Sequence, residues 1–262
     1  MFADVIEEPV GPDLIVKKHL GPTRFEDVEI DVDLRPSQLL CDWIAHEWRR
    51  DHGGGQRRDG TIVLFDSQSN IVSERNFFHA PLLEVTVPAC DVLSKESHLT
   101  LRFRPEEIRT VKPGGRSYVE VETTAQQIWH PSNFRLEIPG LDTSHVAKID
   151  AFAVREAAID PHHPARWGNL SFPNLRITIS ESKGAQGWVN WFEDFVLRGN
   201  NEANREKSGQ LLFLSPDLQE VLRINLLGLG IFRMAPETAA TSRGDAPSRL
   251  TADLYCQRME FE

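Results

Sequence analysis

Apolar and polar residues alternate strictly along residues 28–34 of this chain. The polar members are Glu29, Asp31 and Asp33. Successive side chains of a β-strand point to opposite faces, so the pattern predicts a strand with one apolar face and one acidic face. The apolar members, which we expect in the core, are Val28, Ile30, Val32 and Leu34.

After this strand, apolar residues recur at helical spacing, which predicts a helix. Ser37 is a suitable N-cap, and basic Arg49 and Arg50 suit the C-terminal end of a helix dipole. Residues 51–60 then predict a glycine-rich polar loop. The further elements expected in this half are strands at 62–65, 71–78 and 99–104, a hairpin turn at 66–70 and a loop at 88–97.

The second half of the chain predicts similar elements. Aromatic residues recur on one side of an expected helix over 185–197. Strands are expected at 134–138, 147–154, 175–179, 211–214, 221–226 and 250–256, with loops at 160–168 and 202–209. Each half is therefore mainly β with one flanking helix, which favours a β-barrel or a β-sandwich.

The first residues show no clear period. Residues 1–13 contain two prolines and four acidic residues, so we expect an arm or a loosely attached segment. A short strand is expected at 14–17 and a turn at Gly21-Pro22.

One pattern occurs twice along the chain, at a nearly constant offset. Residues 60–66 match 209–215 at an offset of 149, and Trp43 matches Trp191 at 148. Two further segments agree at nearby offsets, 25–30 with 172–177 and 99–103 with 250–254. This order predicts tandem domains at 1–112 and 132–262, joined by a connector at 113–131.

Composition indicates a globular chain. The 262 residues are 40% hydrophobic and 26% charged, with a formal net charge of −10. Binding to nucleic acid needs clustered basic residues, so specific or nonspecific binding of this kind is not expected. The first residues do not have the pattern of a secretory signal, and no apolar run has membrane-spanning length.

Motifs of catalysis or metal binding are not found in the sequence. Cys41, Cys90 and Cys256 are too widely spaced for a metal site and are expected to be reduced. His162-His163 has no second ligand pair at metal spacing, and residues 53–55 are not followed by the residues of a phosphate-binding loop. We therefore expect no enzymatic activity, no metal and no cofactor.

The acidic face of residues 29–33 allows three interpretations. It is a solvated surface, an acidic stripe facing a channel, or a set of acid–base groups. A channel stripe would repel phosphate or acidic cargo. The corresponding residues of the second half are not acidic, so such a ring would alternate in charge. The candidate channel-facing residues are Glu29, Asp31, Asp33, Arg176, Thr178 and Ser180.

The elements follow one another as strand, helix, polar loop, hairpin and strand. This order resembles that of the tail-tube proteins of contractile phages, a family with relatives in contractile injection systems and type VI secretion. The motifs that carry the resemblance are Asp42-Trp43-Ile44, residues 57–66 and Asn76-Phe77. Residues 133–141 look like the family's opening strand and turn. The match is best over 24–109, and tube subunits of the family usually hold one such unit rather than two.

The resemblance implies a structural, virion-type component with two tube-like domains. Such domains form sixfold or pseudo-sixfold rings that stack around a channel, and three two-domain chains would close one ring. The expected partners are the chain itself as a homo-oligomer, and sheath, spike or hub proteins. Assembly is expected in a bacterial cytoplasm. The alternatives are a baseplate hub or tube initiator, a monomeric β-sandwich binding module, and an enzyme.

Two polar loops interrupt the halves at matching places, so they are candidates for contacts between neighbouring units or stacked rings. Their candidate residues are Gly53, Gly54, Gly55, Arg57 and Arg58 in the first half, and Ala203, Arg205 and Lys207 in the second.

Overall fold

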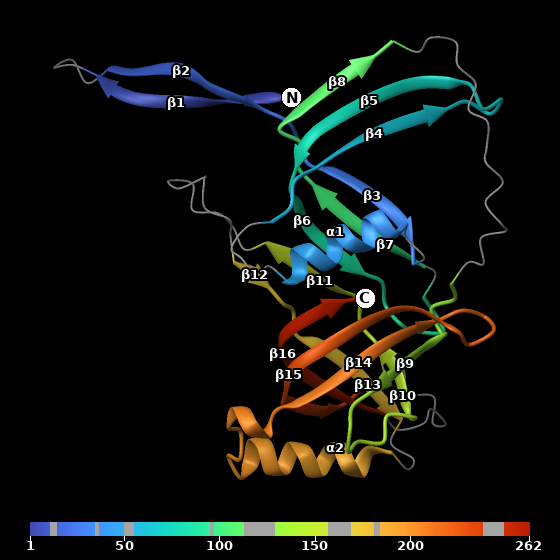
Figure 1. The fold of residues 1–262 in the computed structure, drawn as a ribbon. Coiled ribbons are helices and arrows are strands. Elements are labelled where there is room, and N and C mark those ends of the chain that lie inside the picture. The colour runs from blue at the N-terminus through green and yellow to red at the C-terminus, as the bar shows by residue number, and fades with distance from the viewer. Residues whose placement is uncertain are drawn as a thin grey trace. The chain divides into compact units, whose positions relative to one another are not determined.

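The computed structural model describes residues 1–10, 15–34, 37–49, 55–94, 97–112, 129–156, 169–180, 184–237 and 249–262. The fold is mainly β, as the sequence predicted (Figure 1). The described residues form two compact units. Unit 1 contains the described parts of 1–29, 56–83 and 102–124, and unit 2 contains those of 30–55, 84–101 and 125–262.

Unit 1 begins with a two-stranded hairpin of β1 (Phe2–Val10) and β2 (Ile15–Arg24). No strand was predicted in residues 1–13, but residues 2–10 form β1; residues 11–13 lie outside the described residues. Cross-strand ion pairs accompany the pairing, since Lys18 Nζ lies 2.7 Å from Glu7 and Arg24 lies 3.3 Å from Asp4. Gly21-Pro22, predicted as a turn, lies within β2, where an edge strand tolerates both residues.

A three-stranded sheet completes unit 1, in the order β4 (Arg58–Phe65), β5 (Ile71–Ala80) and β8 (Glu107–Val111). The predicted hairpin turn at 66–70 is confirmed, and the carboxylate of Asp66 accepts hydrogen bonds from the backbone N–H groups of Gln68 and Asn70. Strand β8 was not predicted. The polar loop predicted at 51–60 ends earlier, because Arg58 already belongs to β4.

Unit 2 contains most of a five-stranded sheet in the order β12-β11-β6-β7-β3. Its strands are β3 (Val28–Asp33), β6 (Leu82–Val87), β7 (His98–Phe103), β11 (Phe152–Glu156) and β12 (Leu170–Ser171). The single strand predicted at 147–154 is in fact two. β10 (Val146–Ile149) ends before Asp150-Ala151, and β11 continues in a different sheet.

A six-stranded, barrel-like sheet forms the rest of unit 2, in the order β10-β13-β16-β15-β14-β9. Its other strands are β9 (Phe134–Glu137), β13 (Leu175–Ser180), β14 (Lys207–Leu214), β15 (Glu220–Pro236) and β16 (Arg249–Phe261). Most of the fully buried apolar side chains of unit 2 come from these strands, which makes this sheet the centre of its core.

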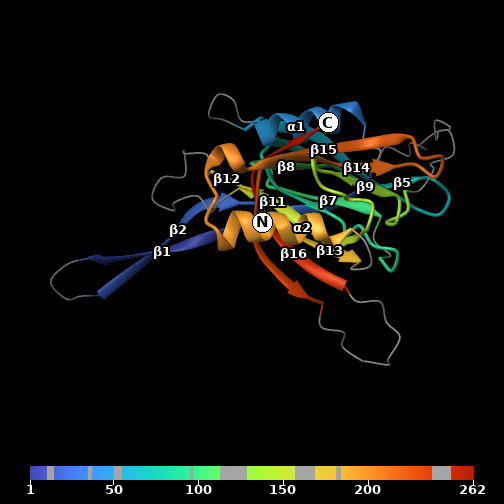
Figure 2. The same cartoon turned by 90° about the horizontal axis from the view of Figure 1, so that it is seen from below.

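Two helices pack on this sheet within the described residues. The predicted helix α1 (Gln38–Arg49) contacts β16, where the rings of Trp48 and Phe261 lie 5.4 Å apart. The other, α2 (Ala185–Phe192), continues as a π-helical turn (Glu193–Leu197) and contacts β15. Figure 2 shows the two helices on different sides of the six-stranded sheet.

Element boundaries in the two halves of the chain correspond closely. β3 and β13 begin at 28 and 175, and the helices begin at 38 and 185, so both pairs have the same offset of 147. β4 and β14 begin at 58 and 207, an offset of 149. The single strand β15 matches β5 and β6 together, because this second offset relates its first residue to Ile71 and its last to Val87.

Strand order corresponds as well. In the second half β14, β15, β16 and β13 are neighbours in this order. In the first half β4 pairs with β5 and β5 with β8, while β6 pairs with β7 and β7 with β3. β5 leads directly into β6, and β7 into β8, so these two pairs correspond to the long strands β15 and β16. The first half therefore has the same strand order, with the counterparts of the long strands broken at Pro81 and at 104–106.

Local irregularities occur at matching positions too. Left-handed backbone conformations occur at Ser69 (φ 61°) and Leu218 (φ 60°), and again at His79 (φ 52°) and Gly228 (φ 64°), with the same offset in each pair. A register shift precedes Gly60 in β4 and Gly209 in β14. A residue other than glycine rarely adopts positive φ, so the conformations of Ser69, His79 and Leu218 are uncommon.

The close packing of Gly209 in β14 against β9 can be tested by substitution. A Cβ at Gly209 would lie 2.6 Å from the carbonyl oxygen of Glu137, so β9 would have to shift. We expect Gly209→Ala to lower the unfolding free energy by about 1–3 kcal/mol, measured by urea unfolding. The matched control is Gly187→Ala in α2, where the nearest atom to a Cβ would be 3.6 Å away. This control should gain about 0.5–1 kcal/mol, and equal effects of the two changes would contradict the packing described here.

Candidate assembly surfaces

Strand β3 carries the predicted acidic face. Glu29 and Asp31 are exposed and Asp33 is half-buried, whereas the alternate residues Val28, Ile30 and Val32 are half-buried. Leu34, after the strand, is fully buried. The acids therefore lie on the wetter side of the strand. That this side lines a channel stays a prediction.

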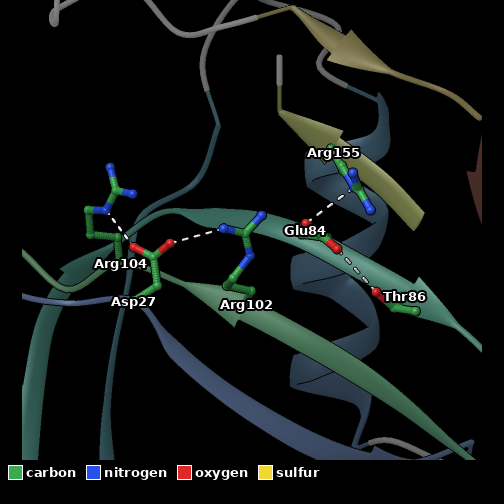
Figure 3. Close-up of polar contacts among 6 residues, drawn as sticks. All are labelled: Asp27, Glu84, Thr86, Arg102, Arg104 and Arg155. Atoms are coloured by element: carbon green, nitrogen blue, oxygen red, sulfur yellow. Dashed lines mark hydrogen bonds and ion pairs between the residues drawn. The ribbon is translucent and has the colours of Figure 1, made fainter. Parts of the chain in front are cut away.

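Basic and hydroxyl groups accompany these acids. Thr100 Oγ1 donates a hydrogen bond of 2.7 Å to Asp31, and His98 Nε2 lies 3.6 Å from the same carboxylate. In unit 1, Asp27 accepts hydrogen bonds from Arg102 (3.1 Å) and Arg104 (2.6 Å), as Figure 3 shows. Asp31 of the acidic face is therefore hydrogen-bonded to the neighbouring strand β7.

A second polar cluster lies on β6 and β11. Arg155 Nε is 3.3 Å from Glu84, and these two residues are direct partners across the two strands (Figure 3). Glu84 also accepts a hydrogen bond from Thr86 (3.3 Å). The pair joins a strand from the first half of the chain to one from the second half. No sequence motif indicates this ion pair, because it depends on the pairing of the two strands.

In the second half, Arg176 and Arg233 lie beside Asp253 of β16. Arg176 donates hydrogen bonds of 2.7 and 3.3 Å to Asp253, and Arg233 lies 3.5 Å from it. The Asp253 side chain is only 11% exposed. Its hydrogen bond, and then its charge, raise the pKa of the Arg176 guanidinium.

The structure corrects one candidate on this face. Thr178 is 4% exposed, so it does not reach an aqueous surface. Strand β13 lies between β10 and β16 in the sheet, and residues 177–179 are buried on both of its faces. Ser180 is half-buried and Arg176 is exposed. The regular alternation of β3 is therefore not repeated in β13, where consecutive residues are buried.

Charges are inverted at three corresponding positions. Glu29 corresponds to Arg176, Glu84 to Arg233, and Arg102 to Asp253, at offsets of 147, 149 and 151. The first half thus has two acids and one base where the second half has two bases and one acid. The opposite signs at matching offsets are the sequence signal that could have identified Asp253.

The predicted assembly loops are only partly described. Gly53 and Gly54 lie outside the described residues, and Gly55 is half-buried. Arg57 forms an ion pair with Glu106. In the second half, Ala203 and Arg205 lie in an exposed 3-10 turn.

Two of these loop residues instead lie in strands. Arg58 begins β4 and Lys207 begins β14. Lys207 Nζ lies over the Trp191 ring at 5.5 Å, so this amine has a cation–π partner. Both strands start earlier than the apolar pattern predicts, because the residues before each bulge still pair with the neighbouring strand.

His162 and His163 lie outside the described residues. Within the part of the chain that the structure describes, no group of three or more His, Cys, Asp or Glu residues could hold a metal ion. No helix in that part is long and apolar enough to cross a membrane. Cys41, Cys90 and Cys256, all of them described residues, form no disulfide.

Comparisons with known proteins give little further information. No family model matches the sequence. No curated protein matches it. Among the solved structures with similarity is a chain of one described as "Cryo-EM structure of the anti-feeding prophage (AFP) baseplate, 6-fold symmetrised". The two chains are 13% identical with a TM-score of 0.33, and the match covers 50% of this chain and 92% of the other. Similarity at this level carries no argument about function.

The Asp253 cluster can be tested by a neutral substitution. We expect Asp253→Asn to lower the unfolding free energy by about 1–3 kcal/mol, because a nearly buried carboxylate with two cationic partners is lost. The control is Asp31→Asn on the exposed face, which should change stability by less than about 0.5 kcal/mol. Similar losses for both variants in urea unfolding would show that the cluster adds nothing.

The three thiols should react slowly with a thiol reagent in the native protein. Burial raises the pKa of Cys41 and of Cys90, and raises that of Cys256 to about 11. The thiolate is the reactive form, so little of it is present near neutral pH. We expect Cys41 to react first in an Ellman assay, and all three thiols to react after denaturation. Rapid native reaction of Cys90 would contradict the described core.

Proposed function

We propose that this chain is a structural subunit of a phage-tail-like tube, and that its two halves occupy alternate places in a pseudo-sixfold ring of three chains. The observation that carries the proposal is the repeated strand order with matching bulges and left-handed residues. A unit that occurs twice in one chain can fill two neighbouring places of a ring. The tube assignment itself comes from the sequence resemblance.

Inverted charges make the two halves unlike. Where the first half has Glu29 and Glu84, the second has Arg176 and Arg233. Glu84 pairs with Arg155 and both arginines pair with Asp253 within the chain, so these charges distinguish the halves without supplying a contact between them. Unlike halves can fill alternate places of a ring.

In this proposal the chain works through shape and self-association, without catalysis or a cofactor. The exposed side of β3 lines the channel, and its acids keep anionic cargo from binding. Assembly takes place in the cytoplasm of a bacterium. Sheath, spike or hub proteins are the further partners.

A tube initiator or hub adaptor is the second candidate. Differences between the halves favour it. Among the described residues, no strand covers the outer edges of β4 and β3, whereas β9 covers β14 and β10 covers β13. Three chains with two unlike halves would present threefold features as well as six similar units, which suits a junction between a sixfold tube and a threefold part.

Native mass spectrometry and electron microscopy test the proposal. We expect trimers, stacked rings or short tubes whose rings show six similar units. Assembly should become more complete as protein concentration rises. A protein that stays monomeric over the whole concentration range would overturn the proposal and favour a β-sandwich binding module. Closed trimers that do not stack would favour the adaptor.

A further inference from the structure

A hairpin from the second half covers a strand edge of the first half. β11 pairs with β6 in a defined register, with Phe152 opposite Val87 and Arg155 opposite Glu84. β12 then pairs with the outer side of β11. Val85 and Val87 of the covered strand are 1% and 0% exposed. The junction is therefore closed by backbone pairing, by apolar burial and by the Arg155–Glu84 ion pair.

The hairpin of β1 and β2 is the counterpart of β11 and β12. β2 lies directly before β3 in the chain, as β12 lies directly before β13, with equally short links between them. Among the described strands, however, β1 and β2 pair only with each other. Val5, Ile15 and Leu20 are 57%, 60% and 73% exposed. A two-stranded ribbon with exposed apolar side chains is marginally stable by itself.

Residues 231–236 of β15 are the counterpart of β6. β16 pairs with one side of them, but β14 pairs no further along β15 than Leu229. The other side has no strand among the described residues. Phe232 is 43% exposed there, and Pro236 is exposed where its counterpart Val87 is fully buried. This edge resembles β6 without its covering hairpin.

Charges at the two edges are complementary to their hairpins. At β6 the edge supplies Glu84 and the hairpin supplies Arg155. On β15 the matching edge residue is Arg233, whose side chain is 62% exposed. Strand β1 carries three acids, Asp4, Glu7 and Glu8, of which Asp4 and Glu7 pair with Arg24 and Lys18 of β2. The edge residue and the strand that corresponds to its cover therefore carry opposite signs in both cases.

We propose that β1 of one copy pairs with the open edge of residues 231–236 in a second copy, and so repeats between chains the β11–β6 junction found within the chain. The contact joins two different surfaces, so it propagates head to tail and closes a ring or extends a filament. Unpaired strand edges readily accept a further strand. The inference rests on the proposed self-assembly and identifies its interface.

Cysteine cross-linking between two differently tagged full-length variants tests the contact. All variants carry Cys41→Ser, because Cys41 is the native thiol that is not buried. One variant carries Ala235→Cys on the open edge, and the other carries Ala3→Cys, Val5→Cys or Glu7→Cys on β1. Three positions are used so that the register need not be known. Mild oxidation should yield a covalent dimer containing both tags.

Two controls use the junction within the chain. Thr86→Cys lies on the covered edge of β6 at the position that corresponds to Ala235, and should give no dimer with the β1 cysteines. Thr86→Cys combined with Ala153→Cys in one chain places the two thiols on directly opposite residues. This variant should form an intrachain disulfide, which shows that strand partners react under the conditions used.

Each outcome is decisive. A dimer with Ala235→Cys at one or more β1 positions, and none with Thr86→Cys, supports the contact. Oligomers that form by native mass spectrometry without the cross-link overturn this contact but leave the proposed tube function intact. A β1 cysteine that joins Ala235→Cys only within one chain also overturns it. Absence of both oligomers and cross-links overturns both proposals.

Discussion

The antiparallel ladder between β15 and β16 is the interaction on which the rest of unit 2 depends. β14 and β9 extend the sheet from the side of β15, while β13 and β10 extend it from the side of β16. The ring of Phe261, at the end of β16, packs against the ring of Trp48 in α1. The register shift between Ile231 and Arg233 lies beyond the last residue that pairs with β14. One ladder thus positions the core, the Asp253 cluster and the open edge.

Local patterns in the sequence predicted much of this fold. The helix at 38–49 and the hairpin around Asp66 follow from apolar spacing and turn residues within a few positions. What could not be predicted depends on distant partners. Residues 147–154 look like one strand, and the break at Asp150-Ala151 arises because β10 joins β13 while β11 joins β6. β1 was missed because acidic residues and Pro9 obscure its alternation.

On the candidate surfaces, too, features that depend on local pattern were predicted, and features that depend on distant partners were not. The exposure of Glu29 and Asp31 follows from period-two alternation, which is local. Thr178 has the same spacing but is buried, and so are its neighbours Ile177 and Ile179. That Asp253 is the centre of an ion-pair cluster is evident only from the structure, in which Arg176 and Arg233 lie beside it. Offsets matched between the two halves could have indicated the change of sign, but not the burial.

The β6–β11 junction also determines when the chain can fold during its synthesis. Val87 pairs with Phe152, which the ribosome adds only after it has made all of 88–151. At about 5–20 residues per second, β6 stays uncovered for roughly 3–13 seconds after it is made. Contacts between residues so far apart in sequence form slowly. A nascent chain that pauses in this interval therefore presents an apolar strand edge to its neighbours on the same message, and chaperone protection would matter most there.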